Sequence, residues 1–449
     1  KIDLLKGVDV IHEIKLQTRV MSQSLLRDNW LIERRVAELL KHERYTPQQL
    51  DAWRREMLAK TLRVAAGFPA YAQLAGRPIS ADNAEDLLKT VPLITKSDLV
   101  TRRAEFYPVK RPWHALGRTG GTTGTPLSVI RSMGSVLSES AFVKRHWAWS
   151  GFQRGMPSAV LRGELVVPLE QTDPPFWTVN RLSNQMMVSS RHLKSQFARP
   201  ILDAFEQFAP KLMQAYPAAA YTLAQLAEQE GRELKIPYIY TSSEIVLPHQ
   251  LEKIESVLGA RVMDLYGMAE RVVLATGCEH GHLHVNTDYS WAEIVDENGQ
   301  PTDGIGSLVG TTFHNHAMPL LRYQLGDLSR WLPGECPCGR PFPRIEPVSG
   351  RTQDQVFDRH GNPLSPALLT FVVKTAEHIR EAQIAQVALD RWQVRVVRYP
   401  QYDQGVEDAI RGNFLKHIDD SAKVDFVYVD EIPRTAAGKF RWLVNEVQR

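Results

Sequence analysis

The first hundred residues place apolar positions at a helical period. The clearest case is TPQQLDAWRREML, in which Leu50, Trp53 and Met57 recur at helical spacing. Thr46 precedes this run as an N-cap, Pro47 stands in the first turn, and a glutamine three residues after the cap completes a capping box. We predict a helix here and assign it to packing rather than to chemistry.

From about residue 155 short apolar runs alternate with helical ones. IPYIYTSSE indicates a buried strand, PHQLEKIESVLG a helix with Leu251, Ile254 and Leu258 on one face, and ARVMDLYG the next strand. Such a βαβ unit predicts a parallel sheet, whose ligands bind at the carboxyl ends of the strands. Both strands end in polar sequences, TSSE and DLYGMAE, so we expect the ligand site there.

The pattern changes again in the second half of the chain. Residues 283 to 330 indicate successive strands joined by Asn, Asp and Gly turns, which predicts a β-rich subdomain over about 275–350. After GRTQDQV we expect a helix near 365–380, strands in AQVAL, QVRVVRYP and KVDFVYVD, and a basic tail. The sequence therefore predicts an α/β fold with a large parallel-sheet domain over 1–351 and a small α+β domain over 352–449.

Composition narrows the classes of partner. A chain of 449 residues with 43% hydrophobic and 23% charged residues is typical of a folded protein of more than one domain. The 54 basic and 51 acidic residues give a net charge of +3, which predicts neither a nucleic-acid nor a membrane partner. Without a signal-peptide pattern or a long apolar run, and with three cysteines, we expect a cytoplasmic protein without a disulfide framework.

The stretch GRTGGTTGTP, residues 117–126, is rich in glycine and threonine. Backbone N–H groups and hydroxyls in such a loop suit a phosphate cradle. The loop lacks the lysine of the Walker pattern, so a simple mobile turn is the alternative on this stretch alone.

Several motifs accompany this loop in a fixed order. TGGTTGTP is followed by SSE, DLYGMAE, YQLGD, GR and PRTAAGK. From about residue 90 to the C-terminus this order resembles that of the adenylate-forming enzymes, the superfamily of acyl-CoA synthetases and adenylation domains. QAYPAAAYTLAQLA, CEHGHLHVNTDYSWAEIVDE and CPCGRPFPRIEPVSGRTQDQV are most similar to its phenylacetate-CoA ligase and capsule-biosynthesis branch.

The resemblance implies ATP-dependent activation of a small carboxylic acid to an acyl-adenylate, with release of pyrophosphate and transfer of the acyl group to CoA. Because this attack joins two anions, the site must neutralise charge. Lys439 matches the adenylation lysine, Glu270 the Mg²⁺-binding glutamate, and Thr122 a catalytic residue of the loop. The implied nucleotide-binding residues are Thr119, Gly120, Gly121, Thr123, Gly124, Ser243, Glu244, Asp264, Leu265, Tyr266, Gly267, Asp327 and Arg351.

Some of these residues have distinct implied roles. Tyr266 matches the residue that stacks on adenine, and Asp327 matches the acceptor for the ribose hydroxyls. Tyr216, Pro217 and Ser242 match walls of the acyl pocket, where nearby aromatic residues favour an aryl acid.

The lysine near the C-terminus implies a small domain that closes for adenylation and rotates for transfer to the thiol, with the hinge just after Arg351. The chain departs from the family at Gln353, at Ala269 and in VFDRHGNPLSP, which lacks the glycine-asparagine segment of the CoA tunnel. These departures leave the acceptor open between CoA, a carrier protein and an amine. Two of them, Ala269 and Gln353, also leave the alternative of a regulatory nucleotide-binding protein that has lost turnover. Separately, we expect a homodimer as one possible assembly.

All three cysteines lie in two turn-like segments, one of them rich in histidine. GCEHGHLH contains Cys278 and three histidines, and ECPCGR contains Cys336 and Cys338. Such soft ligands suit a tetrahedral structural zinc ion, although the spacing in CPC is shorter than usual and free cysteines are the alternative. The resemblance matches Cys278, Cys336, Cys338 and the histidine of LHV to a zinc site in some members, so we prefer His284 as the fourth ligand.

Overall fold

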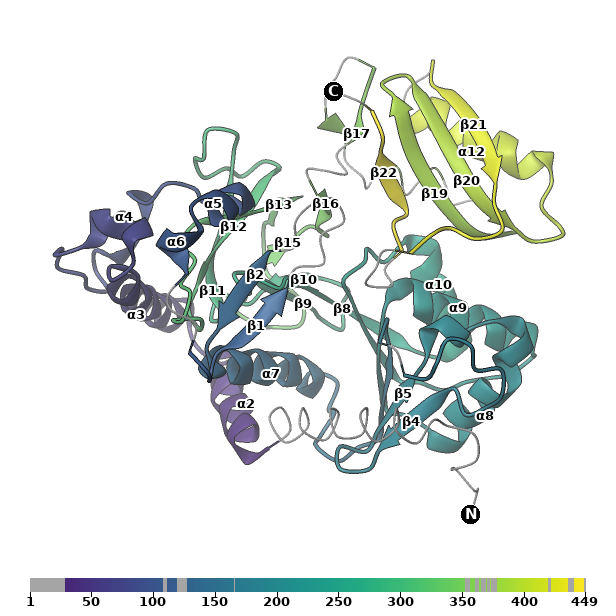
Figure 1. Ribbon diagram of the computed structural model, residues 1–449, viewed down its shortest axis with the longest axis horizontal. Coiled ribbons are helices and arrows are strands. Elements are labelled where there is room, and N and C mark those ends of the chain that lie inside the picture. Colours follow the sequence, from purple (N-terminus) through teal and green to yellow (C-terminus); the bar gives the residue numbers. More distant parts are fainter. Residues whose placement is uncertain are drawn as a thin grey trace.

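The computed structural model describes residues 29–107, 111–118, 127–164, 166–351, 356–359, 363–364, 369, 372, 378–418, 421–434 and 440–447. A large α/β body carries a smaller unit built from the end of the chain, at the upper right of Figure 1. We call the described residues from 356 onward the C-terminal domain. The predicted α/β class is confirmed, and the boundary near Arg351 stays a prediction.

A mixed sheet of ten strands forms the centre of the described large body. Its strands are β3 (Ser158–Leu161), β4 (Trp177–Asn180), β5 (Gln185–Val188), β6 (Leu212–Ala215), β7 (Tyr238–Ser242), β8 (Arg261–Gly267), β9 (Leu274–Gly277), β10 (Leu283–Val285), β14 (Trp331–Leu332) and β15 (Arg344–Ile345). Their order is β14-β15-β10-β9-β8-β7-β6-β3-β5-β4. The middle five, β5-β3-β6-β7-β8, are parallel, so their carboxyl ends meet at one edge.

Helices connect and cover the parallel strands. They are α8 (Ala198–Phe208), α9 (Pro217–Gln229) and α10 (Pro248–Leu258), whose apolar faces share one core with β3, β5, β6 and β7. The predicted βαβ unit is confirmed as β7, α10 and β8. On the predicted face, Ile254 and Leu258 are buried, whereas Leu251 is 38% exposed. Gly259 ends α10 in the left-handed conformation that glycine adopts without strain.

A second, antiparallel sheet lies beside the first. It contains β11 (Ser290–Val295), β12 (Gly306–Thr312), β13 (Tyr323–Ser329) and β16 (Ser349–Arg351), in that order. Strands of the predicted β-rich region, 275–350, therefore divide between two sheets, because β9, β10, β14 and β15 join the large one. Sequence periodicity specifies a strand but not the sheet in which it pairs.

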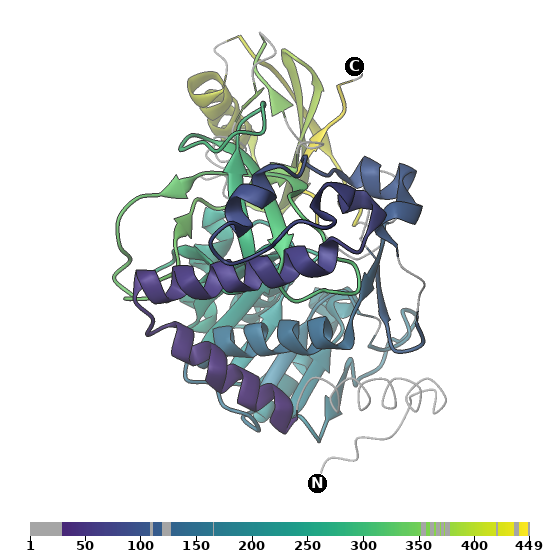
Figure 2. The ribbon, with the colours of Figure 1, turned by 90° about the vertical axis from the view of Figure 1, so that its left-hand side faces the viewer.

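The helices among the described residues before position 150, purple and blue in Figure 2, lie on the side of the large body that faces the viewer. The capping box predicted at Thr46 is present, with Thr46 N–H donating to Gln49 Oε1 at 2.9 Å and Gln49 N–H donating to Thr46 Oγ1 at 3.2 Å. Leu50 is buried there. The elements of the large body not yet given are α2 (Trp30–His42), α3 (Pro47–Ala65), η1 (Pro69–Leu74), α4 (Ala84–Lys89), α5 (Lys96–Thr101), α6 (Arg103–Phe106), β1 (Ala115–Arg118), β2 (Ser128–Arg131), α7 (Met133–Ala148), η2 (Ser190–His192) and η3 (Ser195–Phe197).

The C-terminal domain has its own sheet and core. Its elements are β17 (Val356–Phe357), β18 (Pro363–Leu364), β19 (Ile379–Ala388), β20 (Arg391–Arg398), α12 (Gln404–His417), β21 (Lys423–Tyr428) and β22 (Leu443–Asn445). The sheet order is β21-β20-β19-β22. The helix predicted over 365–380 was wrong at its end, where Ile379 and Arg380 begin β19, and it falls mostly outside the described residues. None of the described helices is long and apolar enough to cross a bilayer.

Candidate active site and metal centre

Three of the predicted nucleotide-binding residues converge from three strands. Tyr266 lies near the end of β8, and its hydroxyl donates a hydrogen bond of 2.6 Å to Oδ2 of Asp327 in β13. Arg351 pairs directly opposite Asp327 in the antiparallel ladder of β13 and β16, where its backbone position is described. The fold thus brings together the residues expected to face adenine and ribose.

Asp264 occupies a close-packed position in β8. Its Oδ1 accepts a 2.7 Å hydrogen bond from the hydroxyl of Thr241 in β7. A side chain on Gly277 would meet the Asp264 amide nitrogen at 2.8 Å, so only glycine allows β9 to approach this closely. Burial raises the pKa of Asp264 to about 6, and the Thr241 hydroxyl opposes this shift by favouring the ionised form.

The DLYGMAE motif continues into a charged neighbourhood. Glu270 Oε1 accepts a 3.2 Å hydrogen bond from the hydroxyl of Tyr323. The guanidinium of Arg131 donates to the carbonyl oxygen of Ala269, one of the positions at which the sequence departs from the family that it resembles. Burial and the nearby Arg271 lower the pKa of Arg131 to about 10. Sequence reasoning missed Arg131, whose signal was its place five residues after the loop that lacks a lysine.

The predicted acyl-pocket residues lie at the carboxyl ends of β6 and β7. Tyr216 is the N-cap of α9 and Pro217 its first residue, while buried Ser242 ends β7. Ser242 Oγ accepts a 2.9 Å hydrogen bond from the guanidinium of Arg162, which directly follows β3. Burial lowers the pKa of Arg162 and raises that of Tyr216, which also lies in the field of Glu164. Sequence reasoning missed this arginine, and the edge is more polar than an aryl pocket requires.

The other predicted residues of this edge have structural partners. Ser243 adopts a left-handed backbone conformation with φ of 72° directly after β7. Glu244 follows, and its Oε2 accepts a 3.1 Å hydrogen bond from the Ala218 N–H in the first turn of α9. Leu265 is half-buried against an apolar cluster, and Gly267 ends β8.

Most of the predicted phosphate loop, and the predicted catalytic lysine, lie outside the described residues. Among the residues outside the description are Thr119, Gly120, Gly121, Thr122, Thr123, Gly124 and Lys439. Their roles therefore stay predictions.

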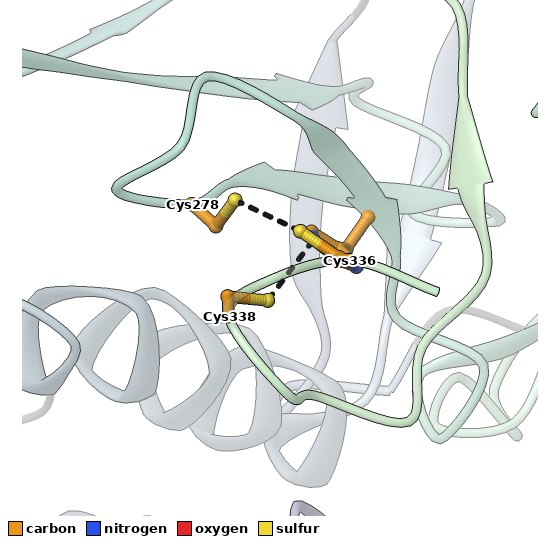
Figure 3. A group of neighbouring side chains, drawn as sticks. Cys278, Cys336 and Cys338 are labelled. Carbon is orange, nitrogen blue, oxygen red and sulfur yellow. Dashed lines mark hydrogen bonds between the residues drawn. The ribbon is translucent and has the colours of Figure 1, made fainter. Parts of the chain in front are cut away.

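Four side chains that could hold a metal ion meet between the two turns singled out in the sequence. The ligand atoms of Cys278, His284, Cys336 and Cys338 all lie within 4.8 Å of one another. The Sγ atoms of Cys278 and Cys336 are 3.7 Å apart, and Cys338 Sγ lies 3.4 Å from His284 Nε2. Figure 3 shows the three cysteine side chains pointing toward one another. These are the four residues that the sequence predicted.

The hydrogen bond of His284 orients its ring for a ligand role. Its Nδ1 lies 2.8 Å from the carbonyl oxygen of Phe342, an arrangement in which Nδ1–H donates and Nε2 keeps its lone pair toward Cys338. Burial lowers the pKa of His284, which keeps the ring neutral as a metal ligand requires. His282 Nδ1 also lies 3.2 Å from Cys336 Sγ, but His282 is outside the group of four.

The donor set fits a divalent metal of the zinc type. Burial, together with hydrogen bonds to the two neighbouring thiols, raises the pKa of Cys336 to about 12. Three thiols at this separation do not ionise together at neutral pH without a cation. Three sulfur ligands and one imidazole nitrogen in mutual contact make the usual tetrahedral shell of a structural zinc site.

Comparison with known proteins agrees with this fold. The model of the CapK C-terminal domain family matches residues 356–446. Protein CapK of Staphylococcus aureus is 24% identical over 388 residues, which cover 84% of this chain and 83% of that protein. Phenylacetate-coenzyme A ligase of Thermus thermophilus is 28% identical over 268 residues, covering 53% of this chain and 60% of the relative.

A solved structure shows the same fold over most of the chain. 2-Hydroxyisobutyryl-CoA ligase in its postadenylation state, in complex with 2-HIB-AMP, matches with a TM-score of 0.67 and 19% identity, covering 88% of each chain. The same ligase in its thioesterification state, with 2-HIB-AMP and CoA, gives a TM-score of 0.54.

The parallel-sheet edge, the ordered motifs and these similarities agree with the resemblance to the adenylate-forming superfamily. Within that superfamily the similar proteins are named CapK and phenylacetate-coenzyme A ligase, and the C-terminal domain matches the CapK C-terminal domain family.

Proposed function

We propose that the protein activates a carboxylic acid with ATP and transfers the acyl group to CoA. A carboxylate oxygen attacks the α-phosphorus and pyrophosphate leaves with the P–O bond electrons. The CoA sulfur then attacks the acyl carbon, and AMP leaves. The observation that carries this proposal is the Tyr266–Asp327 contact at the sheet edge, where the implied adenine and ribose residues meet.

Asp327 and Tyr266 would hold the nucleoside. An ionised carboxylate is the side chain that accepts hydrogen bonds from both hydroxyls of a ribose. The Tyr266 hydroxyl fixes one Asp327 oxygen, which orients the carboxylate before the nucleotide binds. Arg351, opposite Asp327 in the ladder, would contact the ribose or phosphate.

Positive charge for the phosphates would come from several parts of the chain. Mg²⁺ held by Glu270 would supply charge neutralisation to the phosphate oxygens. The hydrogen bond from Tyr323 orients one oxygen of Glu270. The Arg131 guanidinium, held on the Ala269 carbonyl, adds a fixed cation beside the same motif. Lys439 would bring the last cation to the α-phosphate and the substrate carboxylate during domain closure.

The acid itself is proposed from the acyl-pocket residues. Tyr216 and Pro217 support an aryl acid, as the name phenylacetate-coenzyme A ligase of a similar protein does. The Arg162–Ser242 contact favours an acid that also carries a hydroxyl or second anionic group. We place the metal cluster outside this chemistry, as a structural zinc site, because four protein ligands leave no open coordination position.

The acceptor is proposed from similarity and has alternatives. Proteins named as CoA ligases are similar to this chain in sequence and in fold, which supports CoA as the acceptor. A carrier-protein thiol and an amine remain alternatives. We also propose a cytoplasmic address and a homodimer.

ATP–pyrophosphate exchange across a panel of carboxylic acids tests the first step. The panel pairs each aryl acid with the same acid bearing a hydroxyl or carboxyl substituent. We expect exchange with at least one acid and, in Arg162→Met, a selective loss for the substituted member of the pair. ATP binding without exchange on any acid would favour the regulatory alternative. Adenylate that accumulates without thioester at saturating CoA would rule out CoA as the acceptor.

A further inference from the structure

One glutamate of the large body forms a hydrogen bond to the C-terminal domain. Glu244, directly after the end of β7, accepts a 2.7 Å hydrogen bond from the Phe440 N–H at its Oε1. Its Oε2 accepts the 3.1 Å hydrogen bond from Ala218 in the first turn of α9. Phe440 directly follows Lys439 in the sequence. The Glu244 carboxylate therefore connects the end of β7, the first turn of α9 and the residue next to the predicted catalytic lysine.

Apolar neighbours of Glu244 make the same connection. Leu247, 3% exposed, belongs to the hydrophobic core of the C-terminal domain together with Trp442 and Leu443, and Ile245 packs against that core. We call residues 244–247 the docking segment. Because it starts at the carboxyl end of β7, the docking segment fixes the C-terminal domain to the strand edge where ligands are expected.

Phe440 itself is held from several sides. The guanidinium carbon of Arg434 lies 4.5 Å from the centroid of the Phe440 ring, and Arg434 pairs with Glu381 of β19 at 2.6 Å. After Phe440, the Arg441 carbonyl accepts a 2.6 Å hydrogen bond from the side-chain amide of Gln383. Phe440 and its neighbours are therefore held by β19 within the C-terminal domain, and Glu244 adds a polar contact from Phe440 to the large body.

We propose that Glu244 is a positioning residue for adenylation, which holds the main chain beside Lys439 at the edge where nucleotide and acid meet. This inference rests on the proposed function. A carboxylate that accepts N–H groups makes charge-assisted hydrogen bonds, which are stronger than neutral ones. A displacement of about 1 Å at a reacting group is enough to lower a rate roughly 100-fold.

Half-reaction kinetics of Glu244→Ala test the proposal. The loss of a hydrogen bond to a charged group predicts a fall of about 10- to 100-fold in the kcat of ATP–pyrophosphate exchange. We expect the KM for ATP to change less than about twofold, and thioester formation from supplied acyl-adenylate to stay near wild type. Glu244→Gln, which keeps one acceptor oxygen, should recover part of the rate. The matched control is Gln229→Ala, which removes another polar contact between α9 and the C-terminal domain, 3.3 Å to the Tyr399 hydroxyl; it should leave exchange unchanged.

Two kinetic results would overturn the proposal. An unchanged kcat in Glu244→Ala would show that the contact does not position the reaction. A raised KM for ATP with an unchanged kcat would instead make Glu244 part of the adenine pocket.

Amide hydrogen exchange gives a readout that does not need activity. In Glu244→Ala the Phe440 amide should exchange faster, while it stays protected in Gln229→Ala. If wild-type protein activates no acid but the Phe440 amide responds in this way, the proposed function fails and the contact between the domains stands. Unchanged protection at Phe440 in a folded Glu244→Ala protein contradicts the contact itself, whatever the activity.

Discussion

The metal cluster and the nucleotide site differ in how the chain assembles them. The cluster lies on neighbouring strands of one sheet, with Cys278 just after β9, His284 in β10, and the turn of Cys336 and Cys338 between β14 and β15. The nucleotide site combines residues from both sheets, and its predicted phosphate loop and lysine come from distant parts of the chain. The residues of the metal cluster thus come from adjacent strands and their turns, whereas those of the nucleotide site come from separate sheets and, as predicted, from both domains.

We expect this difference to separate a stabilising role for the metal cluster from a catalytic role for the nucleotide site. Three of the four residues of the cluster are buried, and its four ligand atoms already lie within 4.8 Å of one another. Tyr266 and Asp327 are half-buried, and the residues proposed to act with them lie on two domains. Sites that must admit a substrate and then close have this second form.

The largest effect on activity should come from Lys439, the predicted catalytic lysine of the nucleotide site. Lys439→Ala should lower adenylation roughly 100- to 1,000-fold, because it removes a preorganised charge from the transition state. ATP binding should persist, as measured by equilibrium titration beside pyrophosphate exchange. Lys423→Ala is the matched control, since this exposed lysine of the same domain pairs with Asp390 at 2.9 Å. Undiminished exchange in Lys439→Ala would remove the lysine from the mechanism.

Loss of a ligand from the metal cluster should lower the stability of the protein rather than its catalytic rate. Protein prepared without chelator should contain about one zinc ion per chain. His284→Ala should lose the metal and lower the Tm by roughly 5 °C or more, as loss of a structural metal does. His280→Ala, at an exposed histidine of the same turn, should change neither quantity. Elemental analysis without stoichiometric metal would favour free cysteines, and a selective loss of kcat in the folded variant would contradict a purely structural role.

Asp264 provides a pH test of the nucleotide edge. Its folded pKa of about 6 lies above its ordinary value of 3.8, so the folded state binds the proton more tightly than the unfolded state. Stability from this group should therefore fall as pH rises from about 4 to about 6 and stay constant above. Asp264→Asn should gain about 2 kcal/mol relative to wild type across that window, allowing for partial exposure. Chemical denaturation from pH 4 to 7.5 measures this, and a difference independent of pH would contradict the assignment.

The smallest expected effect concerns the orientation of Asp327. Tyr266→Phe keeps the ring but removes the hydroxyl that donates to Asp327 at 2.6 Å. One hydrogen bond is worth about 1 kcal/mol, so the KM for ATP should rise about fivefold while the kcat changes little. Steady-state exchange kinetics check this, and a loss larger than 100-fold would mean that the hydroxyl itself contacts the reacting groups.

Local patterns predicted much of the fold around the site. The βαβ unit of β7, α10 and β8 followed from its periodicity, and the capping box at Thr46 from its residue types. The meeting of Tyr266 with Asp327, and of the four metal candidates, followed from ordered motifs rather than from periodicity. Motif order carries long-range information that a single helix or strand does not contain.

What the sequence did not predict depends on contacts between distant elements. Leu251 has helical spacing like Ile254, yet it is 38% exposed, because spacing alone does not specify how far a packed neighbour covers each position. Arg162 and Arg131 are candidate site residues only through the fold. The pairing of β3 with β6 brings Arg162 to the strand edge, and Arg131 at the end of β2 reaches the Ala269 carbonyl. The docking segment is similar, because the partner of Glu244 lies almost two hundred positions away at Phe440.

Isotope transfer tests the central claim most directly. Wild-type protein is given the best acid of the exchange panel with ¹⁸O in both carboxylate oxygens, together with ATP and CoA, and the released AMP is analysed by mass spectrometry. Attack of the carboxylate on the α-phosphorus followed by transfer to the thiol leaves one ¹⁸O atom in each AMP, which is the predicted result. Unlabelled AMP, or release of ADP and phosphate in place of AMP and pyrophosphate, would contradict adenylation by this protein.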